Sequence, residues 1–405
     1  MKSVKFIHGA DLHLDSPMVG LQSLPPNIFK RLKESTFKAF SCLIDAAIRN
    51  RVDFVILAGD LYDHEDRSIK AQVFLRKEME RLAEEGIDAY LIHGNHDHLS
   101  GNWNVINYPS NVHVFDDVVT VKKMETKNST IVHLYGFSYP ERHVLERKIV
   151  DYQRQSGADF HIGILHGNIE GSKEHGNYAP FQIKELLEKD FDYWALGHIH
   201  KREILNEQPP IIYPGNIQGR NRKEKEIKGC YFVSLHETGP QLEFIETSDI
   251  IWMDLMIDAT LASTFDALYQ ICREQMEHIR REGIGVLANF YVINYRSEEI
   301  GSSNMEELLE IIQEEEKDQE SFVWPVRIHA EEKLFWKREE LSQESDFYGE
   351  LFKVIDDFGE SEEAIESLYK HHSARKYLSA LSVSELDEIR KEAEILLMEG
   401  LIRKR

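Results

Sequence analysis

The sequence predicts an α/β protein with a large multi-strand core, followed by a smaller α/β domain and a helical C-terminal tail. Short apolar runs that end in polar residues recur through the first 250 residues, as expected for buried strands. Helical patterns, with apolar residues three and four positions apart, lie between several of these runs. Beyond residue 334 only the helical periodicity remains. The chain has 405 residues, more than one hydrophobic core usually holds, so we expect separate domains at 1–249, 250–334 and 335–405.

The first domain contains the predicted strands of the large core and two long predicted helices. The helices cover 29–50 and 69–85, and Phe37, Phe40 and Leu43 show the helical spacing in the first of them. The strands are expected at 4–8, 54–57, 89–93, 112–115, 131–135, 161–165, 193–196, 211–213 and 230–235. His8 lies inside the first strand, so we interpret it as a core residue rather than as a metal ligand.

The second domain alternates strands and helices, whereas the tail is entirely helical. The strands of the second domain are expected at 251–257, 287–295 and 323–329, with helices at 263–283 and 305–319 between them. The tail helices are expected at 348–358, 362–370 and 382–401. A terminal module of this size has little core of its own, which indicates that it docks against a partner.

The net charge of −23 is concentrated in the C-terminal part of the chain. Residues 1–250 hold 30 Lys and Arg against 36 Asp and Glu, while residues 251–405 hold 18 against 35. Such a surface repels nucleic acid, so a protein that coats DNA on its own is excluded. A phosphate-bearing substrate must therefore be held by a local basic strip, by bound metal or by a partner. We find neither a membrane-length apolar run nor a secretory signal, and we expect a cytoplasmic protein without membrane association.

Metal-competent side chains follow several predicted strands of the first domain. The motifs are Asp11-Leu12-His13, Gly59-Asp60-Leu61-Tyr62-Asp63, Gly94-Asn95-His96-Asp97, His166-Gly167 and Gly197-His198-Ile199-His200. The carboxyl ends of strands are where open α/β sheets place their sites. Imidazole and carboxylate ligands without thiolate suit Mn, Fe or Zn. In the Asp11/His13 and His198/His200 pairs we expect an extended backbone that directs both side chains to one side.

Together these motifs identify a family, although each alone is weak evidence. A single D-x-H triplet is expected by chance about once in a chain of this length. The whole series, in this order and after apolar strands, resembles the calcineurin-like metallophosphoesterases. Within that family it is similar to SbcD, the nuclease subunit of SbcCD-type DNA repair complexes, and most of all to the short YhaO-like proteins of Gram-positive bacteria. The turn Tyr213-Pro214-Gly215-Asn216-Ile217 extends the likeness towards residue 235.

The resemblance implies a fold and a pair of metal sites. The fold is a metallophosphoesterase β-sandwich flanked by helices (α/β/β/α), with the second domain as a cap. The cofactors are two divalent ions, for which we expect Mn²⁺, with Fe²⁺ or Zn²⁺ as alternatives. One ion is expected on Asp11, His13, Asp60 and His200, and the other on Asp60, Asn95, His166 and His198. Such a pair activates a bridging water and stabilises both oxygens of an in-line displacement.

Further roles are implied for residues around the metals. By the resemblance, His96 contacts the scissile phosphate or protonates the leaving alkoxide, and Asp63 orients its ring. Arg220, Arg222 and Lys223 belong to a basic strip, and we predict that they contact substrate phosphates. The alternative for this strip is a solvated loop of mixed charge.

The predicted function is a metal-dependent DNA nuclease of DNA repair, an exonuclease on DNA ends that also acts as an endonuclease on single strands. The resemblance implies that the tail docks an SbcC-like SMC-type coiled-coil ATPase, and that the chain forms a homodimer through the helices at 29–50 and 69–85. Two alternatives stay open. One is a phosphodiesterase of small molecules or cyclic nucleotides, and the other is a non-enzymatic scaffold of an ATPase complex.

Overall fold

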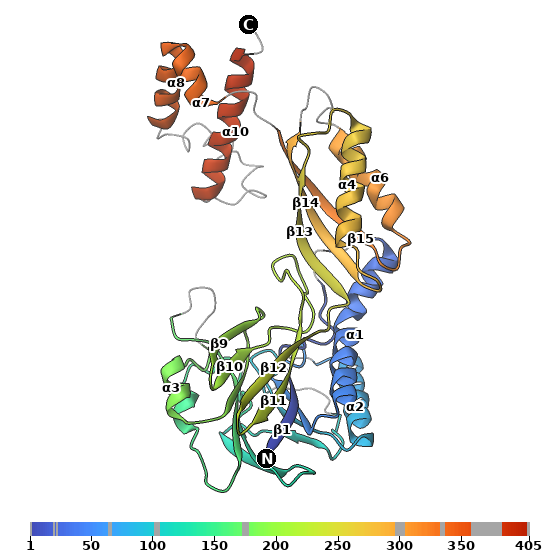
Figure 1. Cartoon of the computed structure of the whole chain (residues 1–405), viewed down its shortest axis with the longest axis vertical. Coiled ribbons are helices and arrows are strands. Elements are labelled where there is room, and N and C mark those ends of the chain that lie inside the picture. The colour runs from blue at the N-terminus through green and yellow to red at the C-terminus, as the bar shows by residue number, and fades with distance from the viewer. Residues whose placement is uncertain are drawn as a thin grey trace. The chain divides into compact units, whose positions relative to one another are not determined.

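The computed structural model describes residues 2–18, 21, 23–63, 67–100, 106–171, 178–295, 304–332, 337–357 and 383–402 (Figure 1). The chain divides into two units, Met1–Glu332 and Lys333–Arg405. The predicted helix at 362–370 lies outside the described residues. Among the helices that the structure describes, none is both long and apolar enough to cross a membrane.

Two six-stranded sheets form the larger part of the first unit. One sheet has the order β12-β11-β1-β2-β3-β4, and the other has the order β5-β6-β7-β8-β10-β9. The strands of the first sheet are β1 (Ser3–Gly9), β2 (Phe54–Ala58), β3 (Asp88–Ile92), β4 (Val112–Val114), β11 (Gly229–His236) and β12 (Gly239–Glu246). Those of the second are β5 (Thr120–Glu125), β6 (Ile131–Gly136), β7 (Phe160–His166), β8 (Tyr193–Gly197), β9 (Glu203–Glu207) and β10 (Pro210–Tyr213). β1 to β4 run parallel to one another, as do β6, β7 and β8.

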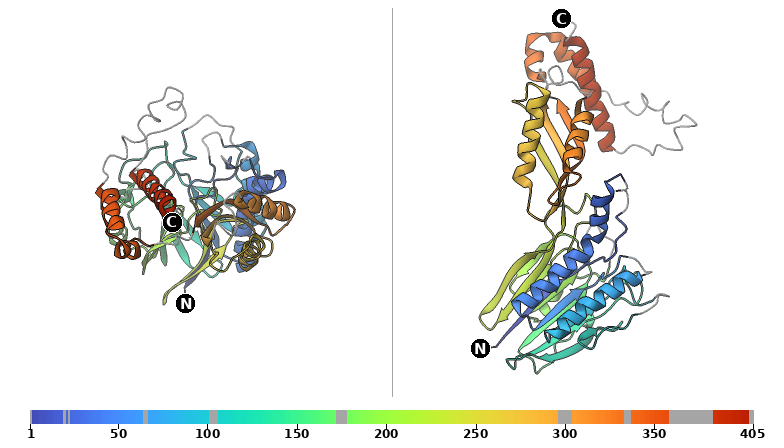
Figure 2. Two further views of the ribbon diagram at one scale, coloured as in Figure 1. Left: turned by 90° about the horizontal axis from the view of Figure 1, so that it is seen from above. Right: turned by 90° about the vertical axis from the view of Figure 1, so that its right-hand side faces the viewer.

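The two sheets pack face to face, and helices cover their outer faces. Alternate residues of β1, such as Val4 and Phe6, point into a shared core that also holds Ile162 and Ile164 of β7. The opposite face of the first sheet packs against α1 (Pro26–Asn50) and α2 (Ile69–Glu84), the two blue helices in the right-hand view of Figure 2. The second sheet carries α3 (Ile183–Glu188) and the short 3₁₀ helix η1 (Lys148–Asp151) on its outer side. The predicted α/β/β/α arrangement is therefore confirmed (Figure 1).

A third, three-stranded sheet completes the first unit. β13 (Ile250–Asp258), β14 (Gly285–Tyr295) and β15 (Val323–Glu332) are parallel, and α4 (Phe265–Ile279) and α6 (Asn304–Glu316) form the crossovers between them. Both helices pack on the same face of this sheet (Figure 1).

The start of α1 holds the third sheet in place. Ile28 and Leu32 of α1 pack against Trp252 of β13 and against Phe322. Arg31 donates two hydrogen bonds to the carboxylate of Asp249, at 3.0 and 2.9 Å. This apolar contact and the bidentate ion pair join the sheet to the sandwich.

The second unit is a small helical module. It consists of α7 (Arg338–Glu344), α8 (Asp346–Asp357) and α10 (Val383–Ile402). Leu341, Tyr348, Phe352 and Met398 form its core. Arg338 of α7 adds an ion pair to Glu394 of α10. The three helices therefore pack on one another, but around few buried side chains.

Candidate metal centre

The predicted ligands lie in loops at the carboxyl ends of β1, β2, β3 and β8 and at the last residue of β7. The loops after β1 and β2 continue to pair beyond their strands. The amide of Asp11 donates to Gly59 O at 3.1 Å, and the amide of His13 donates to Asp60 O at 3.0 Å. The Asp11 carboxylate in turn accepts from the amide of His198 at 2.9 Å, which ties the first sheet to the second.

Four of the predicted ligands have a left-handed backbone conformation rather than an extended one. Asp11, His13, Asp60 and His198 have φ values of 53°, 43°, 49° and 98°. The expected extended conformation of the Asp11/His13 and His198/His200 pairs is therefore wrong. Non-glycine residues rarely adopt this region, and its concentration here is typical of functional sites whose surroundings enforce the geometry.

The first predicted ligand set forms one cluster. Asp11, His13, Asp60 and His200 each offer a donor atom, and these atoms lie within 4.8 Å of one another. The Nε2 atoms of His13 and His200 face each other at 3.1 Å. Two imidazole nitrogens pointed at each other in a buried pocket suit a shared cation.

The second predicted set forms an adjoining cluster through Asp60. Donor atoms of Asp60, His166 and His198 lie within 4.8 Å of one another. The Asn95 side-chain oxygen lies 3.0 Å from both His166 Nε2 and His198 Nδ1. His166 Nδ1 donates to the carbonyl of Ala58 at 2.9 Å, so Nε2 is the ring nitrogen directed at the cluster. The structure thus brings all seven predicted ligands together, with Asp60 common to both sets.

The electrostatics of the cluster favour bound cations. Burial would lower the pKa of His166, but the neighbouring carboxylates of Asp60 and Asp11 outweigh it and raise that pKa to about 9. Burial, and then the positive charge of Arg220, lowers the pKa of His13 to about 3, so this imidazole is neutral at pH 7. The buried carboxylates therefore draw positive charge into the site, while His13 keeps a nitrogen lone pair available. This donor set fits divalent metal ions.

His96 lies beside the clusters with an orientation of its own. Its Nδ1 donates to the backbone carbonyl of Asp63 at 2.8 Å, and its amide donates to the Asp60 carboxylate at 2.9 Å. Since a carbonyl only accepts, Nδ1 carries a hydrogen and Nε2 is the nitrogen that exchanges a proton. The Asp63 carboxylate lies 3.1 Å from His13 Nδ1 and also pairs with Arg220. Asp63 thus contacts His96 through its backbone and His13 through its side chain.

Glu224 and Asp97 were not predicted, yet both hold site residues in place. Glu224 accepts from His200 Nδ1 at 2.8 Å and from Arg220 at 3.1 Å. Asp97 accepts from the amides of Gly94 and Leu61, at 2.7 and 3.0 Å. Asp97 belongs to the G-N-H-D motif, so the motif itself was its signal. Glu224 lies in a charged loop where no sequence pattern distinguishes it from Glu226.

Comparison with known proteins places the chain in a family. Residues 4–202 match the model of the calcineurin-like phosphoesterases. YhaO of Bacillus subtilis, an uncharacterized metallophosphoesterase, is 41% identical over 406 residues, which cover 99% of this chain and 98% of YhaO. The chain is a calcineurin-like metallophosphoesterase. The predicted likeness to YhaO-like proteins is thereby confirmed.

The metallophosphoesterase is also similar to proteins named for DNA repair. The DNA double-strand break repair protein Mre11 of Sulfurisphaera tokodaii is 28% identical over 258 residues, 60% of this chain and 63% of that relative. Mre11 of Sulfolobus acidocaldarius is 24% identical over 308 residues, 69% of this chain and 75% of that relative. The chain thus spans a little under two thirds of the first of these two relatives.

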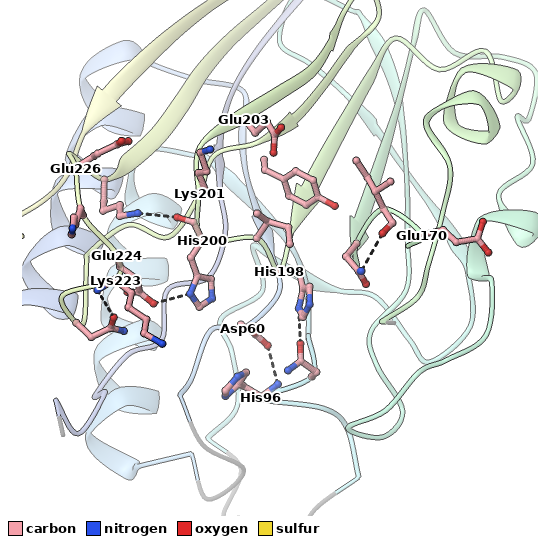
Figure 3. A pocket seen from close by; sticks show the side chains of 18 of the residues that line it. Asp60, His96, Glu170, His198, His200, Lys201, Glu203, Lys223, Glu224 and Glu226 are labelled. Atoms are coloured by element: carbon pink, nitrogen blue, oxygen red, sulfur yellow. Dashed lines mark hydrogen bonds and ion pairs between the residues drawn. The ribbon is translucent and has the colours of Figure 1, made fainter. Parts of the chain in front are cut away.

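A cavity of about 1230 Å³ opens above the metal centre of the metallophosphoesterase (Figure 3). Asp60, His96 and His198 lie at one side of it, and Lys201 and Lys223 also line it (Figure 3). The cavity is therefore wide enough for more than a single phosphate and carries both the metal donors and cationic side chains.

The three predicted phosphate contacts lie in different surroundings. Arg220 is mostly buried and is paired with Asp63 and Glu224, so it belongs to the wall of the site. Lys223 lines the cavity. Arg222 lines a neighbouring groove instead.

Proposed function

We propose that this metallophosphoesterase is a metal-dependent DNA nuclease of DNA repair, an exonuclease on DNA ends that also cuts single strands, working in the cytoplasm. The observation that carries the proposal is the pair of donor clusters joined at Asp60 beside a wide cavity with lysines. The two relatives named for DNA double-strand break repair support the choice of substrate.

The residues around the cavity would have different roles in phosphodiester hydrolysis. Two divalent ions on the seven donors, for which we favour Mn²⁺, would polarise the phosphodiester and activate a water. His96, fixed through Nδ1, presents Nε2 as the group that protonates the leaving oxygen. Lys201 and Lys223 hold the flanking phosphates without reading sequence.

We also propose an SbcD-type assembly around this nuclease. The helical second unit would dock an SbcC-like coiled-coil ATPase, and its exposed apolar side chains Phe347, Val354 and Leu396 on α8 and α10 support such a contact. A homodimer would form through α1 and α2, and the exposed apolar side chains Ile69 and Val73 of α2 support this contact. The partner would provide much of the DNA affinity that the acidic surface lacks.

The test is hydrolysis of end-labelled linear DNA by the purified chain, with Mn²⁺ and with EDTA. Asp60→Asn should abolish degradation because Asp60 belongs to both donor clusters. Asp151→Asn, at an exposed aspartate of η1, is the matched control and should retain it. DNA degradation that persists in Asp60→Asn would contradict the proposed site.

Bis-p-nitrophenyl phosphate distinguishes a wrong substrate from an inactive centre. If the chain cleaves this small diester in an Asp60-dependent way, alone and with the proposed partner ATPase, but never cleaves DNA, the substrate is a small molecule or cyclic nucleotide and the nuclease proposal fails. Cleavage of DNA only after the ATPase is added would support the assembly.

A further inference from the structure

A second groove continues from the metal cavity onto the face of the third sheet that lies opposite α4 and α6. It has a volume of about 850 Å³. Asn221, Lys223 and Lys225 line both this groove and the metal cavity, so the two spaces meet at this loop. From there the groove runs along β14 and β15, on the face opposite α4 and α6 (Figure 1). A ligand that leaves the metal centre along this loop would enter the groove.

The charge of the groove is opposite to that of the chain. Arg222, Lys223, Lys225 and Arg327 line it, and none of the described residues that line it is acidic. This is notable in a chain with 71 Asp and Glu and a net charge of −23. Lys225 is paired with Asp254 at the groove's edge, while Arg222, Lys223 and Arg327 are exposed. The groove therefore attracts a polyanion where most of the surface would repel it.

An aromatic platform lies among these cations. Tyr291 of β14 and His329 of β15 are register partners, and their rings stack with centroids 4.9 Å apart and planes 14° from parallel. His329 is exposed and Tyr291 half-buried, and both line the groove, so a ligand in the groove can reach the stacked pair. Base–aromatic stacking combined with cationic side chains is how proteins hold single nucleic acid strands without reading their sequence.

We propose that this groove binds an extended single strand of nucleic acid that is continuous with the strand at the metal centre. Phosphates would contact Arg222, Lys223 and Arg327, and a base would stack on the Tyr291–His329 pair. A duplex does not fit this chemistry, because base faces are covered by their neighbours in the stack. The inference rests on the proposed nuclease function. It adds that the DNA is unwound or single-stranded where it passes the third sheet.

The test is the anisotropy of a fluorescein-labelled oligothymidylate bound to the full chain in EDTA, where no cleavage occurs. Tyr291→Ala should weaken binding roughly 5-fold or more, the loss of one base stack. Arg327→Ala should lower the slope of log affinity against log salt by about 0.7, the loss of one phosphate contact. Tyr269→Ala and Arg273→Ala, on α4 at the covered face of the same sheet, are the matched controls and should bind like the wild type.

An abasic strand separates stacking from a general loss of structure. With that probe Tyr291→Ala and the wild type should bind equally, because no base is present to stack. Equal affinity of Tyr291→Ala and Tyr269→Ala for oligothymidylate would overturn the proposal, as would stronger binding of duplex than of single strand. Metal content and the thermal unfolding midpoint show whether each variant is folded.

The two proposals fail in different ways. If the wild type degrades DNA with Mn²⁺ and Tyr291→Ala binds oligothymidylate normally, the groove is wrong and the nuclease stands. If the wild type binds oligothymidylate through Tyr291 but never cleaves DNA, the groove stands and the nuclease is wrong.

Discussion

The contact between Glu224 and His200 shows how a residue outside the ligand set shapes the metal centre. The carboxylate of Glu224 accepts from His200 Nδ1, which fixes the proton on that nitrogen and directs the Nε2 lone pair towards His13. Lys228 donates to the carbonyl of His200 at 2.9 Å and anchors the backbone of the same residue. His200 is therefore held in ring orientation and in position before any metal binds.

Glu224→Gln should weaken metal binding about 10- to 100-fold, because the amide accepts less strongly and leaves the ring of His200 less well fixed. The measurement is calorimetric titration of the metal-free chain with Mn²⁺, with metal content as a second readout. Glu226→Gln, an exposed neighbour in the same loop, is the control and should bind like the wild type. The same Mn²⁺ affinity in both variants would show that Glu224 does not position the ligand.

His96→Ala should retain bound metal but lower the rate of DNA cleavage by about 10²-fold or more. The substitution removes a proton donor and not a metal ligand. The loss should be smaller for bis-p-nitrophenyl phosphate, whose leaving group departs readily without a proton. Metal content measured beside both rates tests the assignment. Loss of bound metal in this variant would mean that His96 is a ligand.

The motif residues were predictable because their chemistry is local to the sequence. Each ligand lies at or just after the end of an apolar strand, which made it a candidate, and the resemblance of the whole motif series to the metallophosphoesterases assigned it to a metal site. His8 is confirmed as a core residue, with ring nitrogens 2.9 Å from Tyr193 OH and 3.2 Å from Leu196 O. Glu224 was not predictable, because its partner His200 is reached only when the loop folds back across 24 positions of sequence.

At the scale of elements, the strands that were missed all lie at the edges of the sheets. β2 and β8 are internal strands in which every residue is buried, and β3 is internal and buried apart from Asp88. β5, β9 and β12, which were not predicted, are edge strands with charged and partly exposed residues, whereas the short apolar edge strand β4 was predicted. Edges carry charge to prevent pairing with other chains, so the apolar signal of a strand is weakest there.

Gly59 shows why the turn after β2 requires a glycine. Its φ is 92°, and a Cβ atom there would lie 2.3 Å from His166 Nδ1. Gly157 has a similar φ of 98° but no heavy atom within 4 Å of such a Cβ. A side chain at either position would strain the left-handed backbone. Only at Gly59 would it also collide with a predicted metal ligand, His166.

Gly59→Ala should lower metal content and the free energy of unfolding by more than Gly157→Ala does, because His166 must move. The measurements are urea unfolding and metal content after loading with Mn²⁺. Equal effects of the two substitutions would mean that the contact with His166 relaxes without disturbing the site.

At the scale of the whole molecule, all described donor atoms of the metal centre lie in Met1–Glu332. The cavity and the groove are lined by residues of the same unit. The helical unit has its own small core around Leu341, Tyr348 and Phe352. Chemistry and the proposed partner contact are therefore assigned to different units of the chain.

Removing residues 333–405 should leave hydrolysis of bis-p-nitrophenyl phosphate within about 2-fold of the full chain, since Met1–Glu332 contains the metal centre and the cores that support it. The same deletion should abolish co-purification with the proposed ATPase. A matched full-length variant, Leu396→Asp, removes an exposed apolar side chain of α10 and should weaken only the partner contact. Collapse of small-diester hydrolysis on deletion, with Leu396→Asp fully active and still bound to the ATPase, would instead mean that the helical unit supports the structure of the first.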